Sequence, residues 1–431
     1  MRKTLSILLV LALLCAPLVA CGGTPAPVAP PPPADDTPAA APEEPADDGD
    51  PEEDVGDTSA KHTLRVWAAQ EDQAMMHDLA VAFIEANPDY SVHIEFGVVG
   101  EPDAFPRFAE DPSAAADVFT FPNDQLRDFV RAGGLYEVQR NKDDIISRNG
   151  DGSIESATLD GALWAYPKTA DNGYFLFYDK TVLSEEDIQT IDGILEAVQA
   201  ADMKFLMELD NNAWYLASFF LGAGCTIKID ANDVQLVDFN NANGLAAAKA
   251  IKELVSHPDY IHGDGSVLTG GFGGSIAAGV SGIWNLDALL SILGDDLGAA
   301  KLPTFTMDGQ QVQMGSFGGY KLVGVNAMID DPEKVVIAMD FADFITNEQS
   351  QLLRFETRGF GPSNIQAAAN PAVLENIAVA ALAAQGAYAT PQNDVLGSFW
   401  EPAGAFGTAL VNGDSTDLQE LLDIMVQQIN Q

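Results

Sequence analysis

The sequence predicts an α/β protein with two hydrophobic cores, and three observations carry this prediction. Strand-like and helix-like segments alternate from residue 61 onward, which is typical of an open, largely parallel sheet with helices packed on it. About 370 residues follow residue 60, enough for two cores rather than one. Only one cysteine, Cys225, lies in this part, so we expect packing rather than disulfides to stabilise it.

The first elements follow from hydrophobic periodicity. Apolar residues alternate over residues 64–68 and again over 92–98, which predicts two strands. Between them, residues 76–83 carry apolar side chains at helical spacing, and Asn87-Pro88 ends this helix because proline cannot continue it. Residues 116–121 form a third, more uniformly apolar strand. The order strand, helix, strand, strand starts an α/β sheet.

Similar alternation recurs from residue 203, and the chain ends in an amphipathic helix. Thr416 and Gln419 are predicted to form its capping box. Its apolar stripe has helical spacing and consists of Leu418, Leu421, Leu422, Met425 and Ile429.

The N-terminus predicts export. Arg2 and Lys3 precede a short apolar run at residues 5–14, and Leu18-Val19-Ala20-Cys21 follows. This pattern resembles a bacterial lipoprotein signal, which implies that residues 1–20 are removed and that Cys21 carries a diacylglycerol anchor. An ordinary cleaved signal peptide with an incidental cysteine is the alternative. Either way the protein is exported.

Residues 21–60 are predicted to form the lipidated cysteine and a disordered tether. Residues 24–58 carry 11 acidic residues, 10 prolines and no lysine or arginine. Such a segment buries too little apolar surface to fold, and proline and like charges keep it extended. The tether would hold the folded part up to about 100 Å from its lipid.

The charge balance excludes some partners. The chain has 64 acidic and 21 basic residues, a formal net charge of −43. Phosphate backbones would be repelled, so we expect no nucleic acid binding. Solubility is the simplest explanation of the acidic surface.

A search for catalytic, metal or cofactor motifs yields none. The glycine-rich residues 269–275 lack the Gly-Lys-Ser/Thr ending of a phosphate loop. Asp230, Asn232 and Asp233 are interpreted as a polar turn rather than a calcium loop, and Cys225 as a small buried residue. Five histidines without metal-ligand spacing are interpreted as surface residues, namely His62, His77, His93, His257 and His262. We therefore predict no enzyme activity, metal or cofactor.

The tryptophans are more informative. Trp67 and Trp164 lie beside strand-like segments and are predicted to belong to the core. Trp214, Trp284 and Trp400 each lie where an apolar run meets polar or small residues, as at the mouths of loops. An exposed indole face suits the C–H face of a pyranose ring, while carboxylates and amides bind its hydroxyl groups.

Several segments, in order, carry a family resemblance. They are Leu64 to Asp72, Ala116 to Gln125, Leu163-Trp164-Ala165-Tyr166-Pro167, Gly282-Ile283-Trp284, Gly318 to Val325, Phe360 to Asn364, and Ser398-Phe399-Trp400. From about residue 61 to its end, the chain resembles bacterial extracellular solute-binding proteins of the maltose and maltodextrin type.

The resemblance implies a periplasmic-binding-protein-like type II fold, with two α/β lobes, a ligand cleft and several crossings between lobes. Residues 61–169 plus 320–368 would form the N-terminal lobe, and residues 170–319 plus 369–431 the C-terminal lobe. The aromatic ligand-binding residues implied are Trp284, Trp400, Trp214 and Phe121. The polar ones are Asp124, Asp171, Glu71, Asp72, Gln70 and Gln125.

This chain departs from the family pattern in its basic residues. Gln125 stands where maltose binders have an arginine, and no lysine occurs near Glu71, Asp72 and Gln73. The loss of these basic donors counts against a simple maltose ligand, and Gln125, Asn123 and Gln70 are expected to donate to hydroxyl groups instead. An α-glucan or cyclodextrin remains the preferred ligand, and another neutral oligosaccharide stays open.

The predicted function is a lipid-anchored extracellular receptor that delivers maltodextrin-like oligosaccharides to the permease of an ABC importer. We expect a monomer with a neutral oligosaccharide as ligand. Two alternatives remain open from the sequence. One is an anchored glycoside hydrolase with a pair of catalytic carboxylates, and the other is a binding module that reports to a membrane signalling partner.

Overall fold

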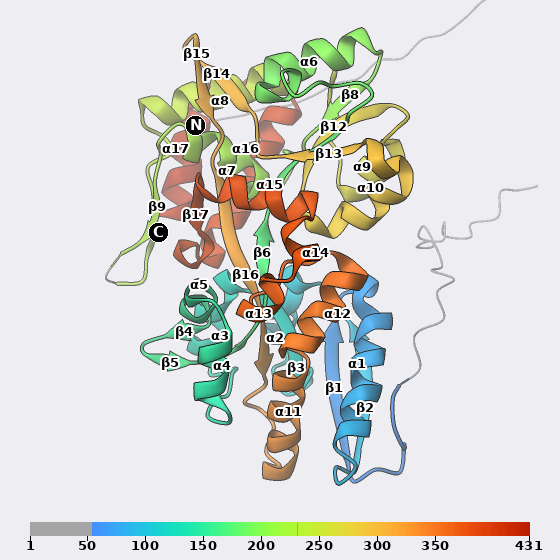
Figure 1. The fold of residues 1–431 in the computed structure, drawn as a ribbon. Helices are drawn as coiled ribbons and strands as arrows, with labels where there is room; N and C mark the ends of the chain where they lie inside the picture. Colours follow the sequence, from blue (N-terminus) through green and yellow to red (C-terminus); the bar gives the residue numbers. More distant parts are fainter. Residues whose placement is uncertain (1–53, 231) are drawn as a thin grey trace, which may run out of the picture. The chain divides into compact units, whose positions relative to one another are not determined.

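The computed structural model describes residues 54–230 and 232–431, and these residues form one compact unit (Figure 1). Its first sheet has the strand order β17–β16–β3–β1–β2, with β6 also paired to β16. The strands are β1 (His62–Ala68), β2 (Val92–Val98), β3 (Val118–Pro122), β6 (Tyr166–Gly173), β16 (Ser316–Val325) and β17 (Ala389–Pro391). We call the part built around this sheet the first lobe.

A second sheet organises the second lobe, in the order β11–β8–β12–β7–β13. Its strands are β7 (Phe175–Asp179), β8 (Lys204–Leu206), β11 (Tyr260–Ile261), β12 (Ile276–Ser281) and β13 (Leu297–Ala300). Three small two-stranded sheets pair β4 (Thr158–Leu159) with β5 (Ala162–Leu163), β9 (Ile227–Ile229) with β10 (Gln235–Val237), and β14 (Thr304–Met307) with β15 (Gln310–Gln313).

Helices surround both sheets. In chain order they are α1 (Gln73–Ala86), α2 (Ala104–Glu110), α3 (Leu126–Arg131), α4 (Lys142–Arg148), α5 (Asp151–Ser156), α6 (Ile191–Ala200), α7 (Ala213–Gly222), α8 (Ala242–Val255), α9 (Gly265–Gly271), α10 (Leu286–Leu293), α11 (Pro332–Phe344), α12 (Glu348–Arg358), α13 (Ile365–Ala368), α14 (Pro371–Leu374), α15 (Ile377–Gly386), α16 (Trp400–Val411) and α17 (Leu418–Ile429).

The opening of the fold confirms the predicted alternation. β1 pairs in parallel with β2 from His62 opposite Val92 to Ala68 opposite Val98, and β3 joins the other side of β1. Helix α1 ends where Asn87-Pro88 was expected to stop it. Parallel pairing requires a crossover between strands, and α1 supplies it. The carboxyl ends of β1, β2 and β3 therefore meet at one edge of the sheet.

Each lobe has its own core. One cluster of buried side chains surrounds the first sheet and includes Leu64, Ile94 and Phe119. Two clusters lie on opposite faces of the second sheet, because side chains alternate along β7: Leu176 belongs to one cluster and Phe177 to the other. The fold is the predicted mixed α/β fold with two lobes.

Two antiparallel strands, β6 and β16, run between the cores (Figure 1). β16 begins with Phe317 in a core of the second lobe and ends with Val323 and Val325 in the core of the first. A further crossing follows α12, where Phe360 joins the second lobe. The lobe boundaries predicted near residues 169, 319 and 368 stay a prediction.

Some sequence predictions need correction. The last helix is capped by Asp417, whose carboxylate accepts a hydrogen bond from the Gln419 amide at 2.9 Å, instead of by the predicted Thr416 box. The surface interpretation is wrong for His62 and His93, which are 5% and 6% exposed in β1 and β2. Neighbouring segments cover both side chains: His62 lies beside Asp331 and Glu333, and His93 lies beside Asp54.

Other predictions are confirmed. Cys225 is buried, and Trp67 and Trp164 pack against the first core. The acidic turn of residues 230–234 joins β9 to β10, where Asp230 accepts hydrogen bonds from the amides of Asn232 and Val234.

The predicted tether begins to fold earlier than residue 61. Val55 and Ile94 exchange two backbone hydrogen bonds of 2.9 and 2.8 Å, which ties this segment to strand β2. The predicted signal peptide (residues 1–20), the anchor Cys21 and the tether through residue 53 lie outside the described residues. Within the part that the structure describes, no helix has both the length and the apolar character needed to cross a membrane.

Candidate functional site

Three tryptophans predicted to bind ligand are half-buried and lie where helices of the second lobe begin. Trp214 stands in the first turn of α7, whose N-cap Asn212 accepts a hydrogen bond from the Tyr215 amide. Trp400 is the first residue of α16. The two indole rings lie 6.0 Å apart, and Phe317 on the crossing strand β16 packs against both. The structure thus brings two of the three predicted platforms together.

Asp124 joins this aromatic group from the first lobe. It follows β3 in a short 3₁₀ turn, Asn123–Gln125, and is buried. Gln392 donates a hydrogen bond of 2.7 Å to its Oδ1, and Asn172 on β6 in turn donates one of 2.7 Å to Gln392. Burial raises the pKa of Asp124 to about 8, and the Trp400 indole opposes part of this shift by hydrogen bonding. Asp124 and Trp400 are therefore neighbours across the lobes.

Trp284 occupies a separate position between β12 and α10. A Cβ atom on Gly282 would lie 2.1 Å from its ring, so the ring lies directly against the backbone and only glycine fits there. Lys321 of β16 lies with its Nζ 5.7 Å from the Trp284 ring centroid and 4.7 Å from that of Phe360. Cation–π attraction of this kind favours a lysine at an aromatic face. Trp284 thus contacts the crossing strand and a core of its own lobe.

Beside Lys321 lies a set of four buried charged residues, which we call the buried ion cluster: Asp72, Glu101, Lys168 and Lys321. Lys168 Nζ lies 3.4 Å from Asp72 and 3.0 Å from Glu101, and Lys321 Nζ lies 2.7 Å from Glu101. The two acids follow the carboxyl ends of β1 and β2, whereas the lysines come from β6 and β16. Ligands of open α/β sheets bind at this edge.

The lysines hold Glu101 ionised. Burial alone would raise the pKa of Glu101, but the adjacent Lys321 and Lys168 outweigh that effect and lower it below its usual range. Burial would likewise lower the pKa of Lys321, and Glu101 reverses the direction. The cluster remains charged inside the protein because each acid has a basic partner.

Arg358, at the end of α12, connects this cluster to the second lobe. Its Nε lies 3.2 Å from Asp72 Oδ1 and its Nη1 lies 3.4 Å from Asp287 Oδ2 on α10. Basic groups near Asp72 thus come from later parts of the chain, namely Lys168, Lys321 and Arg358, and each of them is paired with an acid. No catalytic, metal or cofactor motif contains these three residues or Glu101, and the one local signal is that Glu101 lies just after the parallel strand β2.

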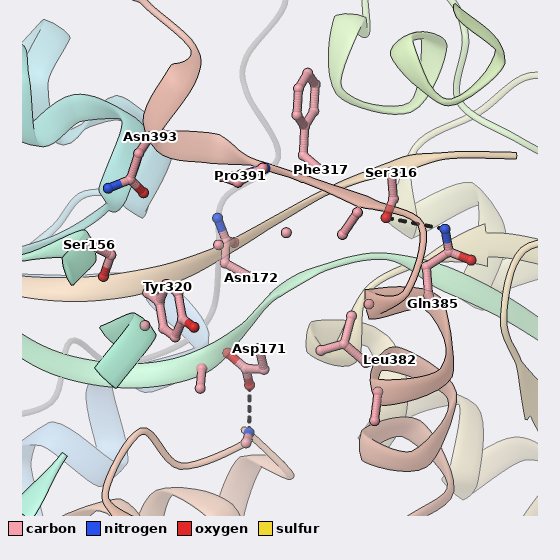
Figure 2. A pocket seen from close by; sticks show the side chains of 18 of the residues that line it. Ser156, Asp171, Asn172, Ser316, Phe317, Tyr320, Leu382, Gln385, Pro391 and Asn393 are labelled. Carbon is pink, nitrogen blue, oxygen red and sulfur yellow. Dashed lines mark hydrogen bonds between the residues drawn. The ribbon is translucent and has the colours of Figure 1, made fainter. Parts of the chain in front are cut away.

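Asp171 on β6 lines a cavity of about 560 Å³ between α5, α15 and the crossing strands (Figure 2). Its Oδ2 accepts a hydrogen bond of 2.6 Å from the Gly361 amide, and its buried Oδ1 has no partner among the described residues. Burial raises the pKa of Asp171, while Lys321 opposes the shift. The other polar lining side chains include Ser156, Asn172, Tyr320, Gln385 and Asn393.

The remaining predicted ligand residues have other surroundings. Gln70 and Glu71 are exposed beyond β1. The Gln125 amide donates to the Pro102 carbonyl and accepts from the Phe105 amide, so it holds the start of α2. Phe121 is fully buried in the first core, 4.7 Å from the Phe129 ring. Gln125 and Phe121 therefore serve packing within the first lobe in this conformation.

Two lobes joined by crossing strands, with aromatic and charged side chains gathered where the lobes meet, define a binding protein of the two-lobed type. A family model for bacterial extracellular solute-binding proteins matches residues 78–381, and the chain belongs to that family.

Known proteins resemble most of its length. A galactooligosaccharide-binding protein of Bacillus subtilis (strain 168) is 28% identical over 375 residues, which are 83% of this chain and 86% of the relative. A structure solved with acarbose is 30% identical, covers 86% of this chain and 99% of its own, and has a TM-score of 0.77. The unliganded maltodextrin binding protein MalE1 from L. casei BL23 is 25% identical, with 86% and 99% coverage and a TM-score of 0.70.

Proposed function

We propose that this protein is a lipid-anchored receptor that binds a neutral oligosaccharide of the maltodextrin type between its lobes and delivers it to an ABC importer. One observation carries the proposal. The half-buried indoles of Trp214 and Trp400 lie side by side in the second lobe, and Trp400 is also a neighbour of the buried carboxyl group of Asp124 from the first lobe. Aromatic plates beside hydrogen-bonding groups suit a sugar, which is apolar on its ring faces and polar at its rim.

In this proposal Trp284 and Trp400 stack on sugar rings and Trp214 supports Trp400. Asp124, Asp171 and Asp72 accept hydrogen bonds from sugar hydroxyl groups, with Glu71 and Gln70 at the exposed rim. Contacts from both lobes make the ligand bind the closed arrangement better than the open one, so it shifts the population toward closure.

The names of similar proteins support an oligosaccharide ligand. One relative is named for galactooligosaccharides, one for maltodextrin, and one structure was solved with acarbose. Maltodextrins are the first choice, and galactooligosaccharides belong in every binding screen.

A thermal-shift screen tests the ligand class. We expect maltotriose or a related oligosaccharide to raise the melting temperature of the full chain, because a ligand that binds only the native state stabilises it by mass action. Tryptophan fluorescence should change in the same titration. An unchanged melting temperature across a broad glycan panel, galactooligosaccharides included, would refute the proposed sugar ligand.

A single substitution tests the stacking role. Trp284→Ala should weaken oligosaccharide binding by more than about tenfold, which corresponds to the ~1.4 kcal/mol or more that a stacked aromatic side chain supplies. Trp164→Ala is the matched control. Trp164 packs against the first core and donates its Nε1–H to the Leu159 carbonyl at 3.1 Å, so its loss should lower stability and leave sugar affinity unchanged. Native affinity in Trp284→Ala would refute the stacking assignment.

Binding without hydrolysis is the second part of the proposal. The relatives named above are binding proteins. We expect no new reducing ends when the purified protein is incubated with maltodextrins. Steady release of reducing ends that is lost in Asp124→Asn would instead establish a glycoside hydrolase.

The anchor is the third part. A Cys21→Ala variant should appear in the culture medium or periplasmic fraction instead of the membrane, with unchanged sugar affinity, because the anchor only sets where the receptor is. A membrane-bound Cys21→Ala protein would contradict lipidation at this residue.

A further inference from the structure

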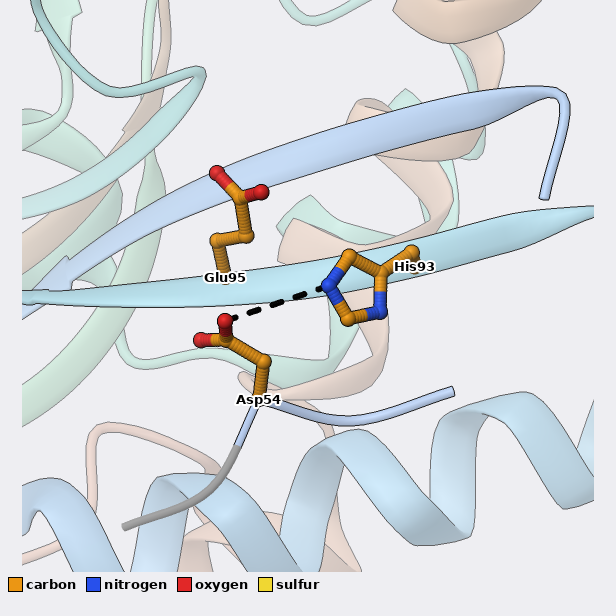
Figure 3. A group of neighbouring side chains, drawn as sticks. All are labelled: Asp54, His93 and Glu95. Atoms are coloured by element: carbon orange, nitrogen blue, oxygen red, sulfur yellow. Dashed lines mark ion pairs between the residues drawn. The ribbon is translucent and has the colours of Figure 1, made fainter. Parts of the chain in front are cut away.

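We propose that Asp54, His93 and Glu95 form a binding site for a divalent transition-metal cation of the zinc type, where the N-terminal tether joins the first lobe (Figure 3). The proposal does not depend on the sugar-binding function.

The backbone brings the three side chains together. β2 is an edge strand of the first sheet, and His93 and Glu95 lie two residues apart on it, so both project from the same face. The two hydrogen bonds between Val55 and Ile94 lay the preceding segment along this strand. Asp54 is thereby placed beside both side chains.

The distances suit a metal after a small adjustment. One potential ligand atom from each of Asp54, His93 and Glu95 lies within 4.8 Å of the other two. Zinc–oxygen and zinc–nitrogen bonds of about 2.1 Å put the ligand atoms of a tetrahedral site about 3.4 Å apart. Asp54 Oδ1 is already fixed by the Phe96 amide at 3.2 Å, and Oδ2 lies 3.9 Å from His93 Nε2. Side-chain rotation of Glu95 and Asp54 closes the difference.

His93 gives an independent indication. Its side chain is more than nine-tenths buried, its Nδ1 is buried without a hydrogen-bond partner among the described residues, and its Nε2 has Asp54 Oδ2 as a neighbour only at 3.9 Å. An imidazole buried without a partner costs free energy, and such groups are uncommon in native proteins. Its Nε2 is the atom that faces Asp54 (Figure 3). A cation bound at Nε2 would replace this long contact with a ligand bond between His93 and Asp54.

Charge and access also fit. An ionised aspartate and glutamate with a neutral imidazole balance a divalent cation, and imidazole with carboxylate is a zinc-type rather than a magnesium-type ligand set. Arg65 stands opposite Glu95 in the sheet, but its guanidinium donates to the Ala114 carbonyl at 2.9 Å. Asp54 is exposed, so an ion and its remaining water ligands have access.

His62 shows by contrast why a buried histidine near acids is insufficient. It lies 3.3 Å from Asp331 and 3.5 Å from Glu333, but Lys61 already forms an ion pair with Glu333. A lysine within that group repels a cation. Asp54, His93 and Glu95 bring three potential ligand atoms together, and none of these three residues forms an ion pair with a lysine among the described residues.

The expected consequence is a fixed junction. A metal bridging Asp54 to β2 would pin the end of the tether and cover part of the edge strand, whose free backbone groups otherwise invite pairing with other chains. The sequence search predicted no metal because Asp54 is far from His-x-Glu in the chain and no regular motif contains all three residues.

Titration of the chelator-treated full chain with Zn²⁺ tests the site. We expect one saturable equivalent, and Co²⁺ at the same site should give the ligand-field absorption bands of a low-coordinate complex. His93→Gln and Glu95→Gln should each weaken this binding by more than about tenfold, since each removes one of three protein ligands. The matched controls His77→Gln and Glu85→Gln, on the neighbouring helix α1, should bind as the native chain does.

Two results would overturn the proposal: saturable binding that is equally strong in His93→Gln and Glu95→Gln, or only weak, unsaturable binding in all variants. If circular dichroism shows that His93→Gln is unfolded, Glu95→Gln decides alone, because Glu95 is only half-buried. Sugar affinity should be the same with and without Zn²⁺, so failure of either proposal is recognised separately.

Discussion

At the scale of single residues, Glu101 has the largest predicted effect on stability. It is the acid that both lysines of the buried ion cluster share. Glu101→Gln leaves Lys321 without its carboxylate partner in a buried position, and removal of one partner from a buried pair costs about 3–5 kcal/mol. Urea unfolding should show this loss. Glu333→Gln, which removes an exposed partner of Lys61, is the control and should unfold as the native chain does. Equal stability of both variants would contradict the account of the cluster.

Asp124 predicts a pH dependence of stability. Its pKa is raised to about 8 by burial, whereas an unfolded aspartate titrates near 3.9. The native state therefore binds more protons than the unfolded state between these values, so the contribution of Asp124 to stability is present below about pH 4 and is lost as pH rises toward 8. Asp124→Asn mimics the neutral carboxyl group. The difference in free energy of unfolding between Asp124→Asn and the native chain should therefore favour the variant more at pH 9 than at pH 6.

Urea unfolding at both pH values, with Asp128→Asn as a second acid-to-amide change, checks this prediction. Asp128 is only partly buried, so its variant should show a smaller pH-dependent difference. A difference between native chain and Asp124→Asn that does not change with pH would contradict the raised pKa.

Some of these residues were predictable and others were not. Trp284 and Trp400 could be proposed as ligand platforms from sequence because each lies in a short local segment that resembles a known family, and their role in binding stays a prediction. The buried ion cluster was not, because its members are residues 72, 101, 168 and 321 and meet only through the strand register of β6, β16 and the first sheet. Phe121 and Gln125 lie in the same family-like segment as Asp124, but in the structure Phe121 is buried in the first core and Gln125 holds the start of α2.

At the scale of elements, helices α10 and α12 form a link between the lobes. Arg358 ends α12, where Leu353 packs against the first core, and its partner Asp287 lies on α10, whose Leu286 and Leu289 belong to the second lobe. Gly359 follows with φ of 69°, a left-handed conformation that ends the helix and that glycine adopts without strain. The ion pair between Arg358 and Asp287 is partly exposed to solvent.

Asp287→Asn should therefore speed release of the sugar modestly. An exposed ion pair contributes up to about 1 kcal/mol, so we expect a dissociation rate raised by less than about fivefold, and a smaller difference at high salt. Stopped-flow tryptophan fluorescence measures it. Asp295→Asn, which removes an exposed acid just beyond α10 without a salt bridge in the described residues, is the control. An effect equal to that of the control would show that the pair does not stabilise closure.

Element prediction succeeded where the pattern was local. β1 and β2 have a clear period of 2 residues and α1 one of 3.6, while β3 is a short, mostly apolar run. β6 does not, since its sequence YPKTADNG places lysine, aspartate and asparagine in buried positions. It is a strand because it pairs with β16, about 150 residues later, while its buried polar side chains find partners on other segments, such as Glu101 for Lys168 and Gln392 for Asn172.

At the scale of the whole molecule, the net charge of −43 predicts salt-dependent stability. Like charges repel more strongly in the compact state, and the Debye length falls from about 30 Å at 0.01 M salt to about 10 Å at 0.1 M. The melting temperature should rise with NaCl over this range, and KCl should act equally. Because the proposed metal site binds a divalent cation, Na⁺ and K⁺ should not occupy it and should not change the melting temperature through it. A constant or falling melting temperature would contradict the importance of self-repulsion.

The proposed anchor, tether and two-lobed body work as one arrangement. Tethering keeps the receptor at a high effective concentration near a membrane partner without adding contacts. The proposed metal site at Asp54 and the proposed sugar site have no residues in common. We expect truncation of residues 1–53 to leave sugar affinity unchanged.

Isothermal titration of the full chain with maltotriose and related oligosaccharides tests the central claim, that an oligosaccharide binds between the lobes on tryptophan platforms. The account predicts a single saturable site with a negative heat-capacity change from burial of apolar surface, and affinity reduced by more than about tenfold in Trp284→Ala. Absence of saturable binding for every oligosaccharide, or equal affinity of the native chain and Trp284→Ala, would contradict it.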